Sequence, residues 1–250
     1  MASVAGITVS DEGGIAVLRL TKPPANAMDP ALVEEGVRVA ADLRAADPDA
    51  VVFTGQDRFF SGGLDLNVIP NLTATEQREM VRGVNQVFAD WYGFPRPVVV
   101  AVNGHAVAGG LILALCGDLR FGVANGKLGL TEVKVGVPYP VAAIEIARAE
   151  VPRKLVRRLV LGGELIEPAE AHAAGILDDV VDDGALLGRS LDAARGLASH
   201  PRRVYETVKR QLRAVALERI GASIDADPLV DTWLGEDTAD AAAATLRGGR

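Results

Sequence analysis

The sequence predicts an α/β fold, and three observations lead to it. Short runs rich in Val, Ile and Ala alternate with longer segments of helical character over the first half of the chain. Turns that contain Gly and Pro separate these segments. The 250 residues are 49% hydrophobic but only 4% aromatic, so Val, Leu, Ile and Ala must fill the core of one substantial domain.

The N-terminal segment predicts a β-hairpin, because β-rich runs at residues 7–9 and 15–18 flank the turn pair Gly13-Gly14. A helix is expected after the Pro-Pro-Ala-Asn loop, with Asp29 as its N-cap and Pro30 at its first position. The next elements are a buried strand, a glycine-bearing loop, a polar helix, a second buried strand, an apolar helix and a third strand. They are expected at residues 50–55, 59–66, 74–92, 97–104, 111–115 and 118–123.

Beyond residue 138 the sequence predicts mainly helices, with one short strand at residues 177–181. Turn signals interrupt this part at Pro152, Gly162-Gly163 and Pro168. The last helices are expected to begin near Ala185, Pro201 and Asp227. The order of elements therefore suggests an α/β core, residues 1–195, and a C-terminal helical region, residues 196–250.

Composition and charge exclude several classes of function. The formal net charge is −7 and no basic stripe is present, so no nucleic-acid partner is expected. The single cysteine, Cys116, excludes an intrachain disulfide, and the three histidines lack the spacing of metal ligands. No basic segment precedes an apolar run, and no apolar run reaches the ~18 residues of a membrane span. We therefore expect no metal, no membrane partner and a cytoplasmic location.

Two glycine-rich segments could bring backbone N–H groups to a ligand. They read Ser-Gly-Gly-Leu-Asp at residues 61–65 and Ala-Gly-Gly-Leu at residues 108–111. Glycine lets the backbone approach a ligand closely, and the first N–H groups of a helix have no internal partner. Two such groups aimed at one point form an oxyanion hole. Either segment alone is better explained as a tight turn, but the two together, each after a buried strand, favour a site.

These two segments, in this order, resemble those of the enoyl-CoA hydratase/isomerase (crotonase) superfamily. The resemblance runs from residue 23 to about residue 181 and includes Gly-Leu-Thr-Glu at residues 129–132. It implies a crotonase-like spiral of ββα units followed by C-terminal helices that trimerise, giving a homotrimer or a dimer of trimers. It also implies an acyl-CoA thioester as the substrate and no separate cofactor.

The resemblance assigns roles to particular residues. The thioester oxygen would accept hydrogen bonds from the N–H groups of Leu64 and Gly109, and one family acid falls on Glu132. Hydratases of the family carry a second acid at a position that Ile112 occupies here. The remaining residues expected around the substrate are Gly62, Gly63, Asp65, Gly110 and Ile112. The retained pattern is most similar to that of Δ3,Δ2-enoyl-CoA isomerases.

One carboxylate can move a proton between two carbons, whereas adding water usually takes two groups. The sequence therefore favours an isomerase that converts a 3-enoyl-CoA into a 2-enoyl-CoA. Hydration or thioester hydrolysis, with Glu132 activating water, is the nearest alternative. A catalytically silent binding subunit is a further one. Without the resemblance, Glu132 beside Lys134 would be read as a surface residue.

Several other residues have simpler readings. Asp65 could be a second base but better suits an N-cap, Ser61 suits a loop hydroxyl, and Cys116 suits the core. His105 is expected in a turn, in a structural role. Lys22 or Arg58 could bind the CoA phosphates. Leu229 and Trp233 are four residues apart, so on a helix they would share one face and could form a subunit interface.

Overall fold

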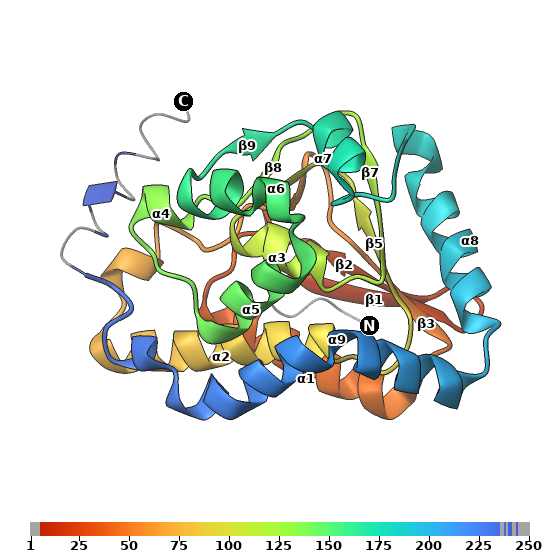
Figure 1. Ribbon diagram of the computed structural model, residues 1–250, viewed down its shortest axis with the longest axis horizontal. Coiled ribbons are helices and arrows are strands. Elements are labelled where there is room, and N and C mark those ends of the chain that lie inside the picture. Colours follow the sequence, from red (N-terminus) through yellow and green to blue (C-terminus); the bar gives the residue numbers. More distant parts are fainter. Residues whose placement is uncertain (1–5, 236–237, 239, 242–243, 245–250) are drawn as a thin grey trace.

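Two mixed β-sheets form the centre of the structure, a computed structural model that describes residues 6–235, 238, 240, 241 and 244 (Figure 1). The larger sheet has the strand order β1-β2-β3-β5-β7-β10 and the smaller one β4-β6-β8-β9. Within them, the pairs β1–β2 and β8–β9 are antiparallel and the others parallel. The strands are β1 Ile7–Asp11, β2 Ile15–Leu20, β3 Ala50–Thr54, β4 Phe59–Ser61, β5 Val98–Val102, β6 His105–Val107, β7 Leu119–Val123, β8 Leu128–Gly129, β9 Leu165–Ile166 and β10 Asp179–Val181.

The strands predicted from apolar runs are confirmed. The N-terminal hairpin pairs Ile7 with Leu20, and Gly13 and Gly14 take the positive φ angles that its turn requires. Every residue of β3 and β5 is buried, as expected for parallel strands covered on both faces. Strands β2, β3 and β5, which are distant in sequence, thus lie side by side in the larger sheet.

The helices cover the sheets in layers. They are α1 Pro30–Ala46, α2 Ala74–Tyr92, α3 Gly109–Leu115, α4 Glu132–Val135, α5 Val141–Glu150, α6 Arg153–Val156, α7 Pro168–Ala174, α8 Leu186–Ala198 and α9 Arg202–Ser223. Helix α8 packs on one face of the larger sheet, against β3, β5 and β7. Helices α1, α2 and α9 run along the lower side of the view in Figure 1, and α3 and α5 lie between them and the smaller sheet. Among the described residues, no helix is long and apolar enough to cross a membrane.

Local sequence signals place the helix ends. Asp29 caps α1, because its side chain accepts a hydrogen bond from the N–H of Leu32 at 2.9 Å, and Pro30 occupies the first position. Thr73 and Glu76 form a capping box at the start of α2. Both helices begin where the sequence predicts, so their positions follow from their own residues.

The smaller sheet was not expected, because its strands are two or three residues long and show no alternation. His105 is therefore in β6 and not in a turn, and its ring packs against that of Phe59 at a tilt of 34°, with 4.9 Å between centroids. The suggested boundary between residues 195 and 196 falls inside α8, whereas a turn near Pro201 separates α8 from α9.

The helix predicted to begin near Asp227 does not begin there. Around Asp227 the described chain forms two short 3₁₀ turns, Ile224–Ala226 and Pro228–Val230, and the Asp227 side chain bonds other segments as well as its own turn. Trp233 is 1% exposed and its Nε1 donates to the carbonyl of Pro138 at 3.0 Å. Leu229 also packs on the core. Trp233 is therefore not available for the subunit interface that the sequence suggested, whereas Leu229 is only partly buried.

Candidate active site

The two glycine loops lie against each other. A side chain added at Gly63 would come within 3.1 Å of the nitrogen of Gly109, and one added at Gly109 would lie 3.8 Å from the Cα of Gly63. Gly63 also has a φ of +82°, so both its conformation and its neighbour require glycine. The loops predicted to share a site are therefore brought together.

A short segment before α1 holds the first loop in place. The side-chain amide of Asn26 donates to the carbonyls of Phe59 and Phe60, both at 3.0 Å. Met28 then forms a parallel bridge to Leu64, in which its N–H donates to residue 63 and its carbonyl accepts from residue 65. This pairing leaves the N–H of Leu64 unused, because it donates to no acceptor among the described residues. The hydroxyl of Ser61 bonds the carbonyl of Asn26, which fits a loop-bracing role.

A strained residue starts the second loop. Ala108 has φ 51° and ψ −128°, a conformation that costs roughly 1–3 kcal/mol for a residue with a side chain. Its N–H bonds the carbonyl of Gly129, and α3 begins immediately afterwards at Gly109. The N–H of Gly109 is in the first turn and has no acceptor in the described part of the chain. The strain at Ala108 thus sets the direction of an unused donor.

A cavity of about 130 Å³ opens beside both loops. Leu64, Gly109 and Glu132 line it, as does Gly62. Most of the remaining lining is apolar. It comes from Met28, Leu66, Val84, Phe88, Val107, Ala108, Val135, Val137, Pro138, Pro140, Ala143 and Trp233, with the polar side chains of Thr131 and Tyr139. The two unused donors and the one acid predicted from the sequence therefore share a small apolar space.

Glu132 is the first residue of α4 and is only 7% exposed, so it is not the surface glutamate that the local sequence suggests. Burial raises the pKa of its carboxyl to about 7, while the nearby hydroxyl of Tyr139 and the residue's own backbone act in the opposite direction. Val133 does not contribute, because its side chain is exposed. With a pKa near 7, a substantial share of the carboxyl is ionised at neutral pH, and the carboxylate is basic enough to take a proton.

The model of the family described as "Enoyl-CoA hydratase/isomerase" matches residues 10–230. This chain belongs to the enoyl-CoA hydratase/isomerase family. It has the α/β crotonase fold, with two mixed sheets and a long C-terminal helix. It is a crotonase-family enzyme that acts on acyl-CoA thioesters.

Individual relatives agree with this assignment. A putative enoyl-CoA hydratase from Thermus thermophilus is 32% identical over 236 residues, covering 90% of this chain and 91% of the relative. A solved enoyl-CoA isomerase from Mycobacterium tuberculosis is 30% identical with a TM-score of 0.82, covering 88% of this chain and 96% of the solved chain. Human mitochondrial Δ3-Δ2-enoyl-CoA isomerase has a TM-score of 0.90 over 97% of both chains, but at 24% identity it supports the fold alone.

Four residues assigned from the crotonase pattern do not line the cavity: Gly63, Asp65, Gly110 and Ile112. Gly110 is needed for packing, because a side chain there would come within 2.2 Å of the carbonyl oxygen of Ser61. Asp65 does not cap a helix. Its side chain accepts from the N–H of Asn67 at 3.0 Å in a local turn. Lys22 lies 2.8 Å from Asp29 and 3.7 Å from Asp65, so acids already surround it.

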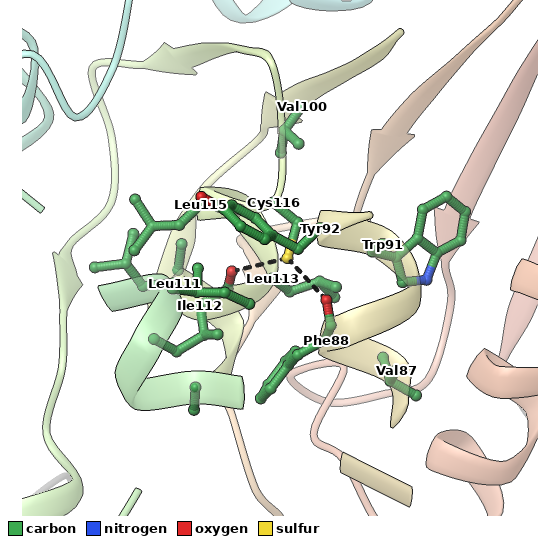
Figure 2. Close-up of a cluster of buried hydrophobic side chains, with 14 of the residues drawn as sticks. Val87, Phe88, Trp91, Tyr92, Val100, Leu111, Ile112, Leu113, Leu115 and Cys116 are labelled. Carbon is green, nitrogen blue, oxygen red and sulfur yellow. Dashed lines mark hydrogen bonds between the residues drawn. The ribbon is translucent and has the colours of Figure 1, made fainter. Parts of the chain in front are cut away.

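Ile112 lies inside the crotonase core, where Figure 2 shows it among Leu111, Phe88 and Cys116. Its side chain is fully buried. The thiol of Cys116 donates to the carbonyls of Ile112 at 3.4 Å and Phe88 at 3.8 Å. Burial raises the pKa of this thiol to about 12, so Cys116 is a core residue and not a nucleophile. Among the described residues, no group of acids, histidines or cysteines could hold a metal ion.

Sequence reasoning about the crotonase site missed most of the lining, including large side chains that come from distant segments: Met28, Phe88, Tyr139 and Trp233. None belongs to the glycine loops or to the Gly-Leu-Thr-Glu motif. No sequence pattern marks them, although Tyr139 follows directly after the apolar frame of Glu132 and stands between two prolines.

Proposed function

We propose that this enzyme moves the double bond of a 3-enoyl-CoA to give a 2-enoyl-CoA. One observation carries the proposal: a single buried carboxylate, Glu132, shares an apolar cavity with the unused N–H groups of Leu64 and Gly109. No second acid lines this cavity among the residues that the structure describes.

The proposed reaction uses these three groups in turn. The thioester oxygen accepts hydrogen bonds from the two N–H groups, which stabilise the negative charge that develops there when C2 is deprotonated. One such donor typically contributes about 3 kcal/mol to the transition state. The ionised carboxylate of Glu132 breaks the C2–H bond and holds the proton. It then returns this proton to C4 of the dienolate, which completes the shift and regenerates the carboxylate.

Hydration is less well supported by the site. Adding water needs one group to activate it and another to protonate carbon, and the position of the hydratases' second acid holds the buried Ile112. The names of relatives point both ways, since the Thermus thermophilus protein is called a putative hydratase and the Mycobacterium tuberculosis structure an isomerase. A silent binding subunit would have no need of a buried carboxylate with a raised pKa.

An assay of the purified protein with 3-enoyl-CoA and 2-enoyl-CoA, side by side, tests the proposal. We expect conversion of the 3-enoyl thioester and little or no 3-hydroxyacyl-CoA from the 2-enoyl thioester. Hydration at a rate equal to isomerisation would favour the hydratase. Tight CoA binding without turnover of either substrate would favour the silent subunit.

The activity should depend on pH through Glu132. Its folded-state pKa is about 7, and the base must be ionised, so kcat/KM is expected to rise tenfold per pH unit below that value and to level off above it. A pH–rate profile between about pH 5 and 9 checks this. A flat profile through pH 7 would show that another group limits the reaction.

We also propose that the protein assembles as a homotrimer or a dimer of trimers, with α9 at an interface. Val204, Val208, Leu212 and Val215 recur at helical spacing on α9, and each is more than half exposed. Leu212 is the most exposed of them, at 84%. An apolar stripe of this kind is typical of a surface that another subunit covers.

Leu212→Glu should therefore reduce the assembled mass, because it places a charge in a dry contact. Light scattering at micromolar concentration measures the mass, and Gln211→Glu adds the same charge at an exposed neighbour and should leave it unchanged. A wild-type protein that is monomeric and active at this concentration would refute the assembly.

A further inference from the structure

Two buried polar atoms in the cavity lack hydrogen-bond partners, and they are complementary. Oε2 of Glu132 can accept a hydrogen bond and the hydroxyl of Tyr139 can donate one, yet neither has a partner among the described residues. Both residues line the same cavity. Buried polar atoms are normally satisfied, so an unpaired donor and an unpaired acceptor in one small space indicate a functional arrangement.

The loop that carries Tyr139 is fixed on both sides. Tyr139 stands between two prolines, whose rings restrict the backbone. On one side, Nε1 of Trp233 donates to the carbonyl of Pro138 at 3.0 Å. On the other, the carboxylate of Asp227 accepts from the N–H of Val141 at 2.8 Å. The hydroxyl is thus held beside the acid by segments that are distant in sequence, as a preorganised site requires.

No other titratable group in the described part of the chain competes for this hydroxyl inside the cavity. The lining side chains from α2, α3, α5, the first glycine loop and the C-terminal segment are apolar, and Thr131 supplies the one further polar side chain. Burial and the neighbouring charge of Glu132 both raise the pKa of Tyr139, so it keeps its proton. The phenol is therefore a donor wherever Glu132 is ionised.

We propose that Tyr139 is a positioning residue for Glu132, whose Oε2 accepts the phenol hydrogen bond while Oε1 takes the C2 proton and returns it to C4. This inference rests on the isomerase function proposed above. The Tyr139 proton is not transferred: the C2–H bond breaks as the Oε1–H bond forms, and that bond breaks again as C4–H forms. Because the phenol holds one oxygen, the carboxyl cannot rotate away between the two steps.

Tyr139→Phe tests the inference kinetically, since it removes only the hydroxyl. We expect kcat to fall about 10-fold or more, as for loss of a hydrogen bond to a charged group, with KM changed little. The acid limb of the kcat/KM profile should move up by about one pH unit, because the phenol favours the ionised carboxylate. Tyr205→Phe removes a hydroxyl that bonds Asp118 outside the cavity and should leave the limb in place. A wild-type acid limb in Tyr139→Phe would overturn the proposal.

A second readout needs no turnover. The infrared band of the protonated Glu132 carboxyl, identified by its absence in Glu132→Gln, reports the titration of this group directly. It should titrate at higher pH in Tyr139→Phe and at lower pH in wild-type protein made with 3-fluorotyrosine, a stronger donor. The fluorinated protein covers the case in which the variant does not fold. Unchanged titration would refute the inference. Shifted titration in an enzyme without isomerase activity would support the Tyr139–Glu132 contact and refute the proposed function.

Discussion

Glu132→Gln is expected to abolish isomerisation, with kcat falling about 10³-fold or more. The amide keeps the shape of the side chain but cannot accept the C2 proton, and the described cavity lining offers no other carboxylate. Stopped assays with 3-enoyl-CoA measure the loss, and calorimetric titration with CoA checks that binding remains. Turnover within a few-fold of wild type would remove Glu132 from the mechanism.

The same variant should be more stable than wild type above neutral pH. The pKa of Glu132 rises on folding, from about 4.5 to about 7. The contribution of Glu132 to the stability of the wild type is therefore fully present below the lower pKa and is lost as pH rises through the higher one. Glutamine carries no charge at any pH, so the variant does not lose stability in this way. Relative to wild type, the free energy of unfolding should therefore improve by up to about 3 kcal/mol between pH 4 and pH 8. Denaturant unfolding at both pH values separates this gain from a general structural effect.

Gly109→Pro should lower kcat by about 10²- to 10³-fold, because proline has no N–H and the thioester oxygen loses one donor. Proline suits the first position of a helix, which Gly109 occupies in α3. It also disfavours the backbone angles of Ala108, the residue before it, so circular dichroism must show that the variant is folded. The loss should appear in kcat more than in CoA affinity, since the donor acts mainly on the charge of the dienolate.

Gly109→Ala is the matched control for this change. It adds the same Cβ, which would approach the mobile end of Met28 at 2.9 Å, but keeps the N–H. We expect the alanine variant to lose far less activity than the proline variant. Equal losses in both would show that crowding of Met28 explains the effect, and retained catalysis in Gly109→Pro would place the oxyanion hole elsewhere.

Elements with strong local signals were predictable from the sequence. The hairpin has its glycine turn, α1 its Asp29 cap and α2 its capping box, so each is specified by adjacent residues. The smaller sheet was not predictable, because β8 and β9 are two residues long and exist only through pairing with distant strands. The same holds for the segment after Asp227, whose side chain is shared between Asn85, Val141 and Leu229.

The candidate site, like the fold, was only partly predictable from the sequence. The glycine loops were recognisable because two of them follow buried strands, and Glu132 was recognisable through the family resemblance that these loops carry. The burial of Glu132 was not, since exposed Val133 and Lys134 follow it directly. Tyr139 and Trp233 enter the cavity through the loop between α4 and α5 and through the C-terminal segment. Such residues carry no pattern of their own, so only the fold identifies them.

Transfer of deuterium from C2 to C4 tests the central claim, that one enclosed carboxylate both removes and returns the proton. A 3-enoyl-CoA deuterated at C2 is converted in ordinary water, and the 2-enoyl product is analysed by mass spectrometry and NMR. Because Glu132 is only 7% exposed and the cavity is largely apolar, we expect part of the label to appear at C4. A product with no deuterium at C4, formed at the normal rate with only solvent hydrogen there, would contradict a single-carboxylate shuttle.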